Sequence, residues 1–399
     1  MSTPADGGRT GPGRRMLWLL LAHSALTQVV TFVLRPTSAY RALELDVPTA
    51  WLGALTASFA VVPLLLAVPS GQATDRFGER RVMLVGAVLL ALSAVVFATE
   101  RGGAAGLVLG SVVLGTGHLL SVVGQQAAVA NTAGPGRFDT AFGHYTFAAS
   151  LGQAIGPALI TLVGGSGALP DTRPIFLTAT GLGVVLLACT VVLRIPGRAR
   201  YGGAAEAGGM GTLLRLPGLV RALVISCVVL AAVDITLVYL PALGADRGLA
   251  AGVVGLLLTL RAVASMASRF FLGRLVAWVG RRRLMIVSVA LSAVSMAAVA
   301  APLPPAALAV LVVLLGLGLG VGQPLTMSWL AEVAPAGLRG RAMSLRLTGN
   351  RLGQVLIPST VGLVAAGVGA AGVLWATAAA LGVVGFAARR LAVDGGPGT

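Results

Sequence analysis

The sequence predicts an all-α membrane protein in which twelve transmembrane helices form two pseudo-symmetric six-helix bundles. Three observations support this fold class. Of its 399 residues, 56% are hydrophobic and only 11% are charged, whereas soluble domains average about 25% charged residues. Twelve apolar runs, each long enough to cross a bilayer, follow one another along the chain. Two features of the first half also recur in the second half at nearly the same displacement.

The apolar runs are joined by short polar segments. We place the spanning helices near residues 16–36, 50–70, 82–99, 105–129, 140–163, 174–193, 220–243, 250–272, 283–302, 306–329, 342–366 and 371–388. Arginines ahead of the first run also suit a secretory signal peptide, but the run is too long and no small-residue cleavage site follows it. We therefore expect an uncleaved first helix.

The polar segments define the domain organisation. The longest interior one, residues 194–219, is rich in glycine and arginine and predicts a flexible cytoplasmic linker. It separates an N-terminal bundle, residues 16–193, from a C-terminal bundle, residues 220–388. Residues 1–15 and 389–399 are expected to form cytoplasmic tails.

The arginines predict the orientation in the membrane. All 29 basic residues are arginine, and the net charge is +16. About twenty arginines fall in segments on the side of the two termini and five on the other side. Because positive residues concentrate in cytoplasmic loops, both termini are expected in the cytoplasm of a multi-pass plasma-membrane protein. The same distribution explains the basic charge without nucleic acid.

A polar motif lies between the second and third apolar runs. It reads G-x-x-x-D-R-x-G-x-R-R, with Gly71, Asp75, Arg76, Gly78, Arg80 and Arg81 in place. In this motif the chain resembles the major facilitator superfamily of secondary transporters. The resemblance implies a cytoplasmic loop whose acid tethers helix two to helix eleven in the outward-facing state. The alternative is a plain turn with boundary charges.

The motif recurs at residues 273–283, displaced by 273 − 71 = 202 residues. The second copy has Ala277 where the acid would fall. A Gly-Gln pair at 152–153 likewise recurs at 353–354, displaced by 353 − 152 = 201 residues. Two matches at nearly one offset indicate duplication, and repeated halves are what alternating access uses.

The fifth apolar run carries a second signature, made of Gly143, Gly152, Gly156 and Pro157. It resembles the core of the antiporter motif of the same family, which implies export. A generic small-residue packing face is the alternative. The fourth run has Ser111 where proton-coupled members of the family usually carry an arginine. That departure leaves the usual route of proton coupling in doubt.

Polar residues inside apolar runs indicate functional positions because lipid makes them costly. Asp234 is the one carboxylate deep in a predicted helix, 234 − 221 = 13 residues from Arg221, or roughly 20 Å. Arg261 lies 12 residues from Gly273, or roughly 18 Å deep. At nearly equal depth, the two predict an ion pair, with a transport role or as a structural bridge.

Further polar side chains fall on the first, fourth and eleventh helices. The predicted cavity residues there are His23, Gln28, His118, Gln125, Asn350, Arg351 and Gln354, with Arg346 on the same face as Asn350 and Gln354. In the resembling family helices one, four, seven and ten line the cavity, which implies that several of these faces converge.

We therefore expect a secondary active transporter that moves a small organic molecule by alternating access, as proton-coupled efflux. Uptake of an anionic metabolite is the alternative. Counting Asp234 against Arg261 and Arg351 leaves +1 in the cavity, which favours an anionic or zwitterionic substrate, unless Arg351 snorkels and leaves a neutral pair. No catalytic or metal-binding pattern occurs, so we expect no enzyme activity, cofactor or metal, and a monomer.

Overall fold

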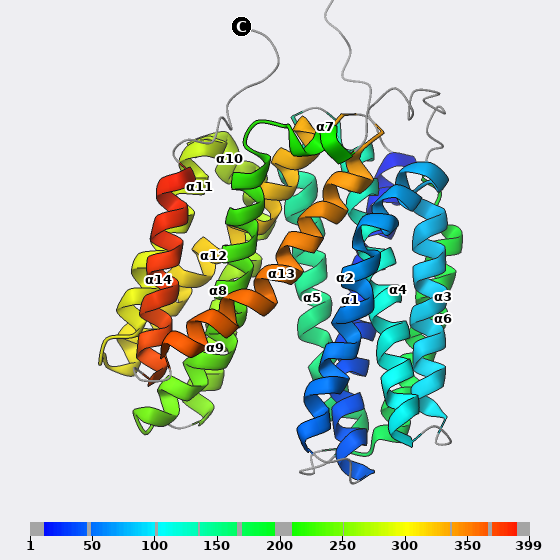
Figure 1. Cartoon of the computed structure of the whole chain (residues 1–399), viewed down its shortest axis with the longest axis horizontal. Coiled ribbons are helices and arrows are strands. Elements are labelled where there is room, and N and C mark those ends of the chain that lie inside the picture. The colour runs from blue at the N-terminus through cyan, green and yellow to red at the C-terminus, as the bar shows by residue number, and fades with distance from the viewer. Residues whose placement is uncertain are drawn as a thin grey trace, which may run out of the picture. The chain divides into compact units, whose positions relative to one another are not determined.

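The computed structural model describes residues 12–45, 49–99, 103–134, 136–165, 170–195, 210–249, 251–335, 337–365 and 369–388, and all of its regular structure is helical (Figure 1). The helices are α1 Pro12–Glu44, α2 Thr49–Phe77, α3 Glu79–Ala98, α4 Gly103–Thr132, α5 Phe138–Gly164, α6 Thr172–Val192, α7 Met210–Leu214, α8 Leu219–Asp246, α9 Ala251–Phe270, α10 Leu272–Val279, α11 Arg281–Val299, α12 Pro305–Val333, α13 Arg339–Ala365 and α14 Gly369–Ala388. The predicted all-α membrane fold is confirmed.

The spanning helices lie where the apolar runs predict them. Within the described ranges, ten helices are long and apolar enough to cross a membrane. The helices α2 and α13, of 29 and 27 residues, lie at the positions predicted for the second and eleventh spans. Two short helices are additional. The helix α7 lies inside the predicted linker, and α10 continues α9 after a break at Phe271.

The structure corrects the predicted motif loops. Residues 71–77 belong to α2, and only Gly78 separates that helix from α3. Gly78 has φ 90° and ψ 152°, a conformation that favours glycine because it has no Cβ. Gly280, 202 residues later, joins α10 to α11 with φ 80° and ψ 149°. The expected turn is therefore one residue long in both copies, and the repeat extends to the backbone.

The chain forms two compact units. Unit 1 comprises Met1–Leu66, Phe77–Ala128 and Ala148–Arg200, and unit 2 comprises Ala67–Arg76, Val129–Phe147 and Tyr201–Thr399. The second unit thus includes the end of α2 and the beginning of α5 as well as the helices from α7 onward.

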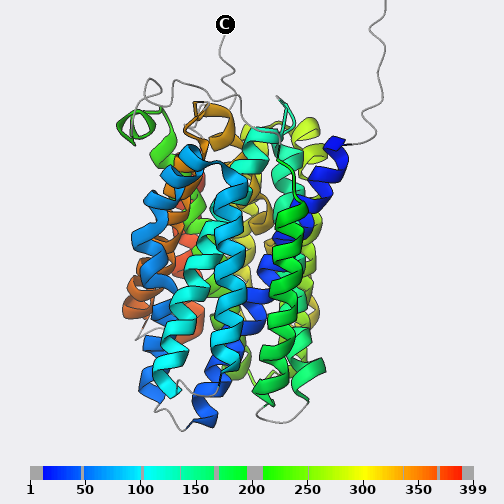
Figure 2. The same cartoon turned by 90° about the vertical axis from the view of Figure 1, so that its right-hand side faces the viewer.

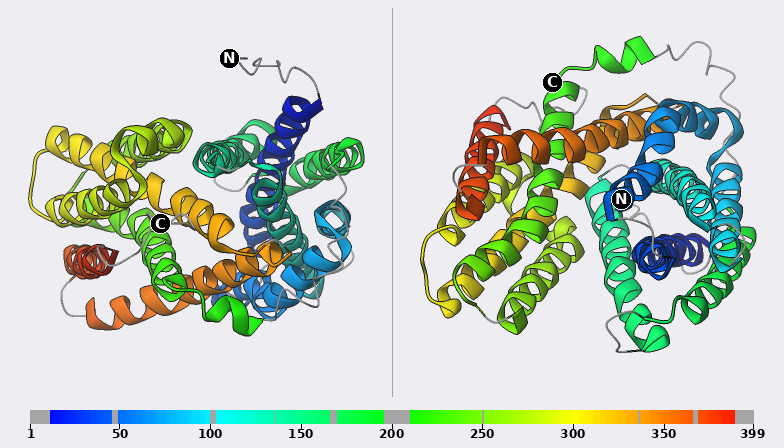
Figure 3. Two further views of the ribbon diagram at one scale, coloured as in Figure 1. Left: turned by 90° about the horizontal axis from the view of Figure 1, so that it is seen from above. Right: turned by 60° about the horizontal axis from the view of Figure 1, so that its bottom comes forward.

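The core of unit 1 surrounds α1. Side chains from α1, α3, α4 and α6 pack into one apolar cluster that includes Val30, Leu34, Leu90, Leu114 and Leu186, each at most 1% exposed. The helices α1, α3 and α6 pack side by side (Figure 2). Seen nearly end-on in the right-hand view of Figure 3, α1 is enclosed by other helices of its unit.

The core of unit 2 surrounds α12. This helix packs against α8, α9 and α11, and α14 covers α8 and α11 (Figure 1). Every residue of α12 from Gly318 to Ala331 is buried. A helix that is buried on all sides must carry apolar or small side chains on every face. The few polar side chains in this part of α12, such as Gln323 and Ser328, have hydrogen-bond partners.

Candidate functional site

The acid of the first motif caps a helix. The Asp75 carboxylate, at the end of α2, accepts hydrogen bonds from the backbone amides of Gly340 at 2.8 Å and Arg341 at 3.0 Å. These amides belong to the first turn of α13, whose positive end favours a carboxylate. The Asp75 side chain is 3% exposed, and the Arg341 Nε lies 3.8 Å from it. The contact joins the two helices that the motif resemblance implies.

Two glycines bring α2 and α13 close together. A Cβ on Gly340 would lie 2.6 Å from the Asp75 Oδ1 and 2.9 Å from the Gly71 carbonyl oxygen. A Cβ on Gly71 would in turn lie 2.8 Å from the Gly340 carbonyl oxygen and would overlap the side chain of Ser344. Both distances are shorter than real Cβ contacts, so only glycine at both positions allows the carboxylate to reach the α13 amides.

The basic residues near this contact serve different neighbours. Arg339, at the start of α13, donates to the carbonyl oxygen of Ala130 at 2.8 Å and to the Asn131 Oδ1 at 3.3 Å, at the end of α4. Arg80 donates to the Val191 carbonyl oxygen at the end of α6. Arg76 and Arg81 are exposed. Two arginines of the motif therefore face outward from their helices.

The second copy of the motif uses a different acid. Ala277 is exposed on α10, whereas Arg281, which opens α11, forms an ion pair with Asp139 of α5, with 2.8 Å between Nε and Oδ2. Arg281 also pairs with Glu332 of α12. Ser328 of α12 donates to the other oxygen of Asp139, which is 5% exposed. Sequence reasoning missed this cluster, for which the only linear signal was an acid in the first turn of α5.

The predicted polar residues of α1 and α4 form a buried network in unit 1. Gln125 donates to the His23 Nδ1 at 2.8 Å and to the Thr27 hydroxyl at 3.0 Å, and the other ring nitrogen of His23 is 2.8 Å from the Thr190 hydroxyl. Both nitrogens of the imidazole therefore have partners in one neutral tautomer. This arrangement favours a structural role for His23.

A second part of that network is looser. The Gln28 Nε2 lies 3.4 Å from the His118 Nε2, and the Gln28 Oε1 accepts from Gln153 of α5, also at 3.4 Å. His118 is half-buried and lies next to Phe59 of α2, with 5.9 Å between ring centroids. Both hydrogen bonds of Gln28 are therefore longer than the bonds around His23.

Unit 2 holds the charged residues. Asp234 of α8 interacts electrostatically with Arg261 of α9, as their predicted depths indicate. Arg261 is 5% exposed, and its Nε is buried with no hydrogen-bond partner among the described residues. A buried guanidinium nitrogen without an acceptor is costly.

A second buried arginine lies on α13. Arg346 is 1% exposed and donates to the Ser226 hydroxyl of α8 at 3.2 Å and to the Gln323 Oε1 of α12 at 3.0 Å. Ser226 donates in turn to the Asn350 Oδ1 at 2.9 Å. Tyr145 of α5 lies near enough to interact electrostatically with Arg346. The predicted residue Asn350 is thus part of a network that joins α8, α12 and α13.

The two arginines of α13 differ in burial. Arg351 is half-buried, whereas Arg346 is enclosed. The side chain of the predicted residue Gln354 lies outside the described residues. Gln323, which sequence reasoning did not single out, is 8% exposed and holds Arg346. The sequence does mark this position, because Gln323 is a polar residue within a mostly apolar helix.

The signature of the fifth run serves helix packing. A Cβ on Gly152 would overlap the Ala25 carbonyl of α1, and one on Gly156 would lie 2.7 Å from the Phe32 Cβ, both within unit 1. In unit 2, a Cβ on Gly143 would lie 2.5 Å from the Arg269 carbonyl oxygen of α9. Pro157 lies inside α5. Gly353, the counterpart of Gly152, packs against α8 as Gly152 packs against α1.

These features define a multi-span membrane transporter. A capped contact between α2 and α13, a repeated motif and buried polar networks in membrane helices are features of a protein that moves solutes. The family model of the Major Facilitator Superfamily matches residues 17–243 and 222–398. The chain therefore belongs to the Major Facilitator Superfamily. No curated protein matches the sequence.

Solved structures of the same fold are similar over nearly the whole chain. The human organic anion transporter MFSD10 (TETRAN) is 18% identical with a TM-score of 0.77, over 95% of this chain and 100% of that one. The E. coli fucose:proton symporter FucP is 14% identical with a TM-score of 0.80, over 94% and 97%. The proton:xylose symporter XylE is 14% identical with a TM-score of 0.75, over 94% and 95%.

Proposed function

We propose that this protein exports a small organic anion or zwitterion across the plasma membrane by proton antiport. The observation that carries the proposal is the charge buried in unit 2. Within the described helix interiors of that unit, Arg261, Arg269 and Arg346 stand against Asp234, and 3 − 1 leaves a net charge of +2. Unbalanced charge is expensive in a medium of low dielectric constant, and an anionic ligand offsets it.

The chemistry of the buried arginines supports the same substrate class. A guanidinium presents a planar fork of donors that matches a carboxylate or phosphate. The Arg261 Nε is buried with no hydrogen-bond partner among the described residues, and a ligand oxygen would supply one. One of the fold neighbours is named an organic anion transporter, in line with this class. A lipophilic cation would instead add to the positive charge.

The proposed direction and coupling rest on residues of the fourth and fifth helices and on Asp234. The glycines of the fifth-run signature pack α5 closely against α1, as an antiporter motif would require. With Ser111 in place of the customary arginine of the fourth helix, Asp234 is the proposed proton carrier. A second candidate is uptake of an anionic metabolite, which is favoured by fold neighbours named as proton symporters.

The capped contact is the proposed gate. In the conformation described here, Asp75 stabilises one arrangement of α2 and α13 through two amides. A transporter that alternates between states must break such a contact once per cycle, and a ligand acts only through differential affinity for the two states. The proposed gate residues are those of the first motif, Gly71, Asp75, Arg76, Gly78, Arg80 and Arg81.

A binding screen on the purified protein tests the substrate class. We expect benzoate and salicylate to raise the melting temperature, and their methyl esters and ethidium to have little effect. Arg346→Gln should weaken binding of the acids by about tenfold or more, the loss of a charge-assisted hydrogen bond, and the half-buried Arg351→Gln is the matched control. Efficient export of ethidium that both variants leave unchanged would contradict the anionic substrate.

Everted vesicles and surface labels test the direction and the topology. Imposed pH gradients should drive accumulation in everted vesicles if the protein exports, and efflux from them if it imports. Tags at either terminus should be inaccessible from outside intact cells, because the arginine count places both termini in the cytoplasm. Labels near Arg101 or Arg173 should react externally. Reversed accessibility would contradict the proposed orientation.

A further inference from the structure

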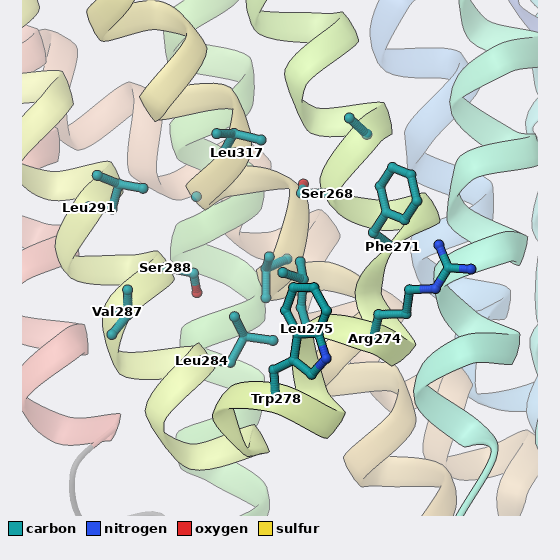
Figure 4. A pocket seen from close by; sticks show the side chains of 13 residues that line it. Ser268, Phe271, Arg274, Leu275, Trp278, Leu284, Val287, Ser288, Leu291 and Leu317 are labelled. Atoms are coloured by element: carbon teal, nitrogen blue, oxygen red, sulfur yellow. The ribbon is translucent and has the colours of Figure 1, made fainter.

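An apolar groove lies on unit 2, and none of the proposed substrate residues lines it. It has a volume of about 470 Å³, which is within the usual range for sites that hold small molecules. The side chains that line it come from α9, α10, α11 and α12 and include Phe271, Leu275, Leu284, Val287 and Leu291. Figure 4 shows Phe271 and Arg274 on the right of the groove, Val287 and Leu291 on the left, and Trp278 below and between them.

The groove is apolar along its walls and basic at one rim. Arg274 of α10 lines it and is exposed, with its guanidinium carbon 5.6 Å from the Phe271 ring centroid. Trp278, one turn further along, is 82% exposed. Tryptophan is typical of the headgroup level of a membrane, and arginine at that level attracts anionic lipid. Arg282 and Arg283, both exposed, follow at the start of α11, next to Arg281, whose charge is paired with Asp139 and Glu332.

The depth of the groove follows from the same residues. Its lining continues along α11 from Leu284 through Val287 to Leu291, two turns from the rim toward the middle of the helix. Val287 is 56% exposed, so the groove opens sideways toward lipid rather than into the interior of unit 2. A long apolar groove that opens to the bilayer and carries positive charge at one end matches an acyl chain below an anionic headgroup.

We propose that this groove binds one anionic phospholipid of the leaflet at the basic end, with its phosphate at Arg274 and an acyl chain along α11. The bilayer supplies this occupant at high local concentration. Under the positive-inside rule the basic end faces the cytoplasm, where the leaflet carries the anionic lipids. Its lining shares no residue with the proposed substrate residues.

Native mass spectrometry of the purified full-length protein tests the proposal. Phosphatidylglycerol and phosphatidylcholine with identical chains are the probes, and we expect one phosphatidylglycerol molecule to be retained in preference. Arg274→Gln should reduce its apparent affinity about fivefold, the loss of one basic contact with an anionic lipid. Arg215→Gln, an exposed arginine at the end of α7, is the matched control and should have no effect.

A second pair of variants tests the groove itself. Val287→Trp fills the groove from the lipid side and should displace both lipids, whereas Val294→Trp, at a lipid-exposed position of α11 outside the lining, should displace neither. Equal retention of the two lipids would overturn the proposal, as would equal effects of the two arginine variants or of the two tryptophan variants. A dimer that excludes lipid would overturn it in favour of a second copy of the chain. None of these measurements depends on transport, so they stand apart from the proposed function.

Discussion

Replacing Asp75 with asparagine isolates the capped contact between α2 and α13. The variant keeps one acceptor oxygen and the shape of the side chain, but it loses the charge and one of the two bonds to the amides of Gly340 and Arg341. A hydrogen bond to a charged group contributes about 1.5–3 kcal/mol. We take about 2 kcal/mol, which corresponds to a shift of about thirtyfold in the opening of this contact.

Hydrogen exchange measures that opening directly. The amides of Gly340 and Arg341 should exchange about thirtyfold faster in Asp75→Asn, because they lose a charged acceptor. The matched control is Asp171→Asn. Asp171 caps α6 through the Arg173 amide at 3.1 Å, so its replacement should affect α6 alone. Transport in proteoliposomes should slow strongly in Asp75→Asn, while Ala277→Asp should change little.

Two results would refute this reasoning at different steps. Unchanged exchange at Gly340 and Arg341 would show that the carboxylate does not hold the α13 amides in the membrane. Faster exchange with normal transport would show that the contact exists but that it does not act as a gate. The Asp171→Asn control separates both results from a general loss of stability.

Three further predictions follow from the same geometry. Gly340→Ala should impair folding or transport as severely as loss of Asp75, since its Cβ would lie 2.6 Å from the Asp75 Oδ1; near-normal activity would contradict the close approach. Asp139→Asn should destabilise the protein by about 3 kcal/mol in urea unfolding, because Arg281 loses a largely buried partner, and the double variant with Arg281→Gln should recover part of that loss. Asp234→Asn should abolish pH-driven flux in vesicles yet retain substrate exchange; intact coupling would shift the proton role to another residue.

The fold and the first motif were predictable from the sequence. Apolar runs of membrane length and clustered arginines are local signals, so each can be recognised without knowing which helices pack together. The capped partner of Asp75 followed from the resemblance. The one-residue turn at Gly78 did not, because a motif rich in polar residues reads as a loop even where those residues continue a helix.

The buried charges were only partly predictable. Arg346 and Arg351 are five residues apart, or about 140° around the helix axis, so at most one can point inward, and the choice depends on where α8 and α12 pack. Ser226 and Gln323 accept hydrogen bonds from Arg346, and both lie on other helices. The cluster of Asp139 with Arg281 has the same origin, since no linear pattern links positions 142 residues apart.

The single glycine between α2 and α3 has a consequence for how this chain can vary in length. One inserted residue would rotate α3 by about 100° about its axis and advance it by about 1.5 Å. Val82, Met83 and Leu90, now buried inside unit 1, would then turn away from its core. The length of the α2–α3 junction therefore fixes which face of α3 is buried. Chain-length variants that remain folded should carry their insertions elsewhere.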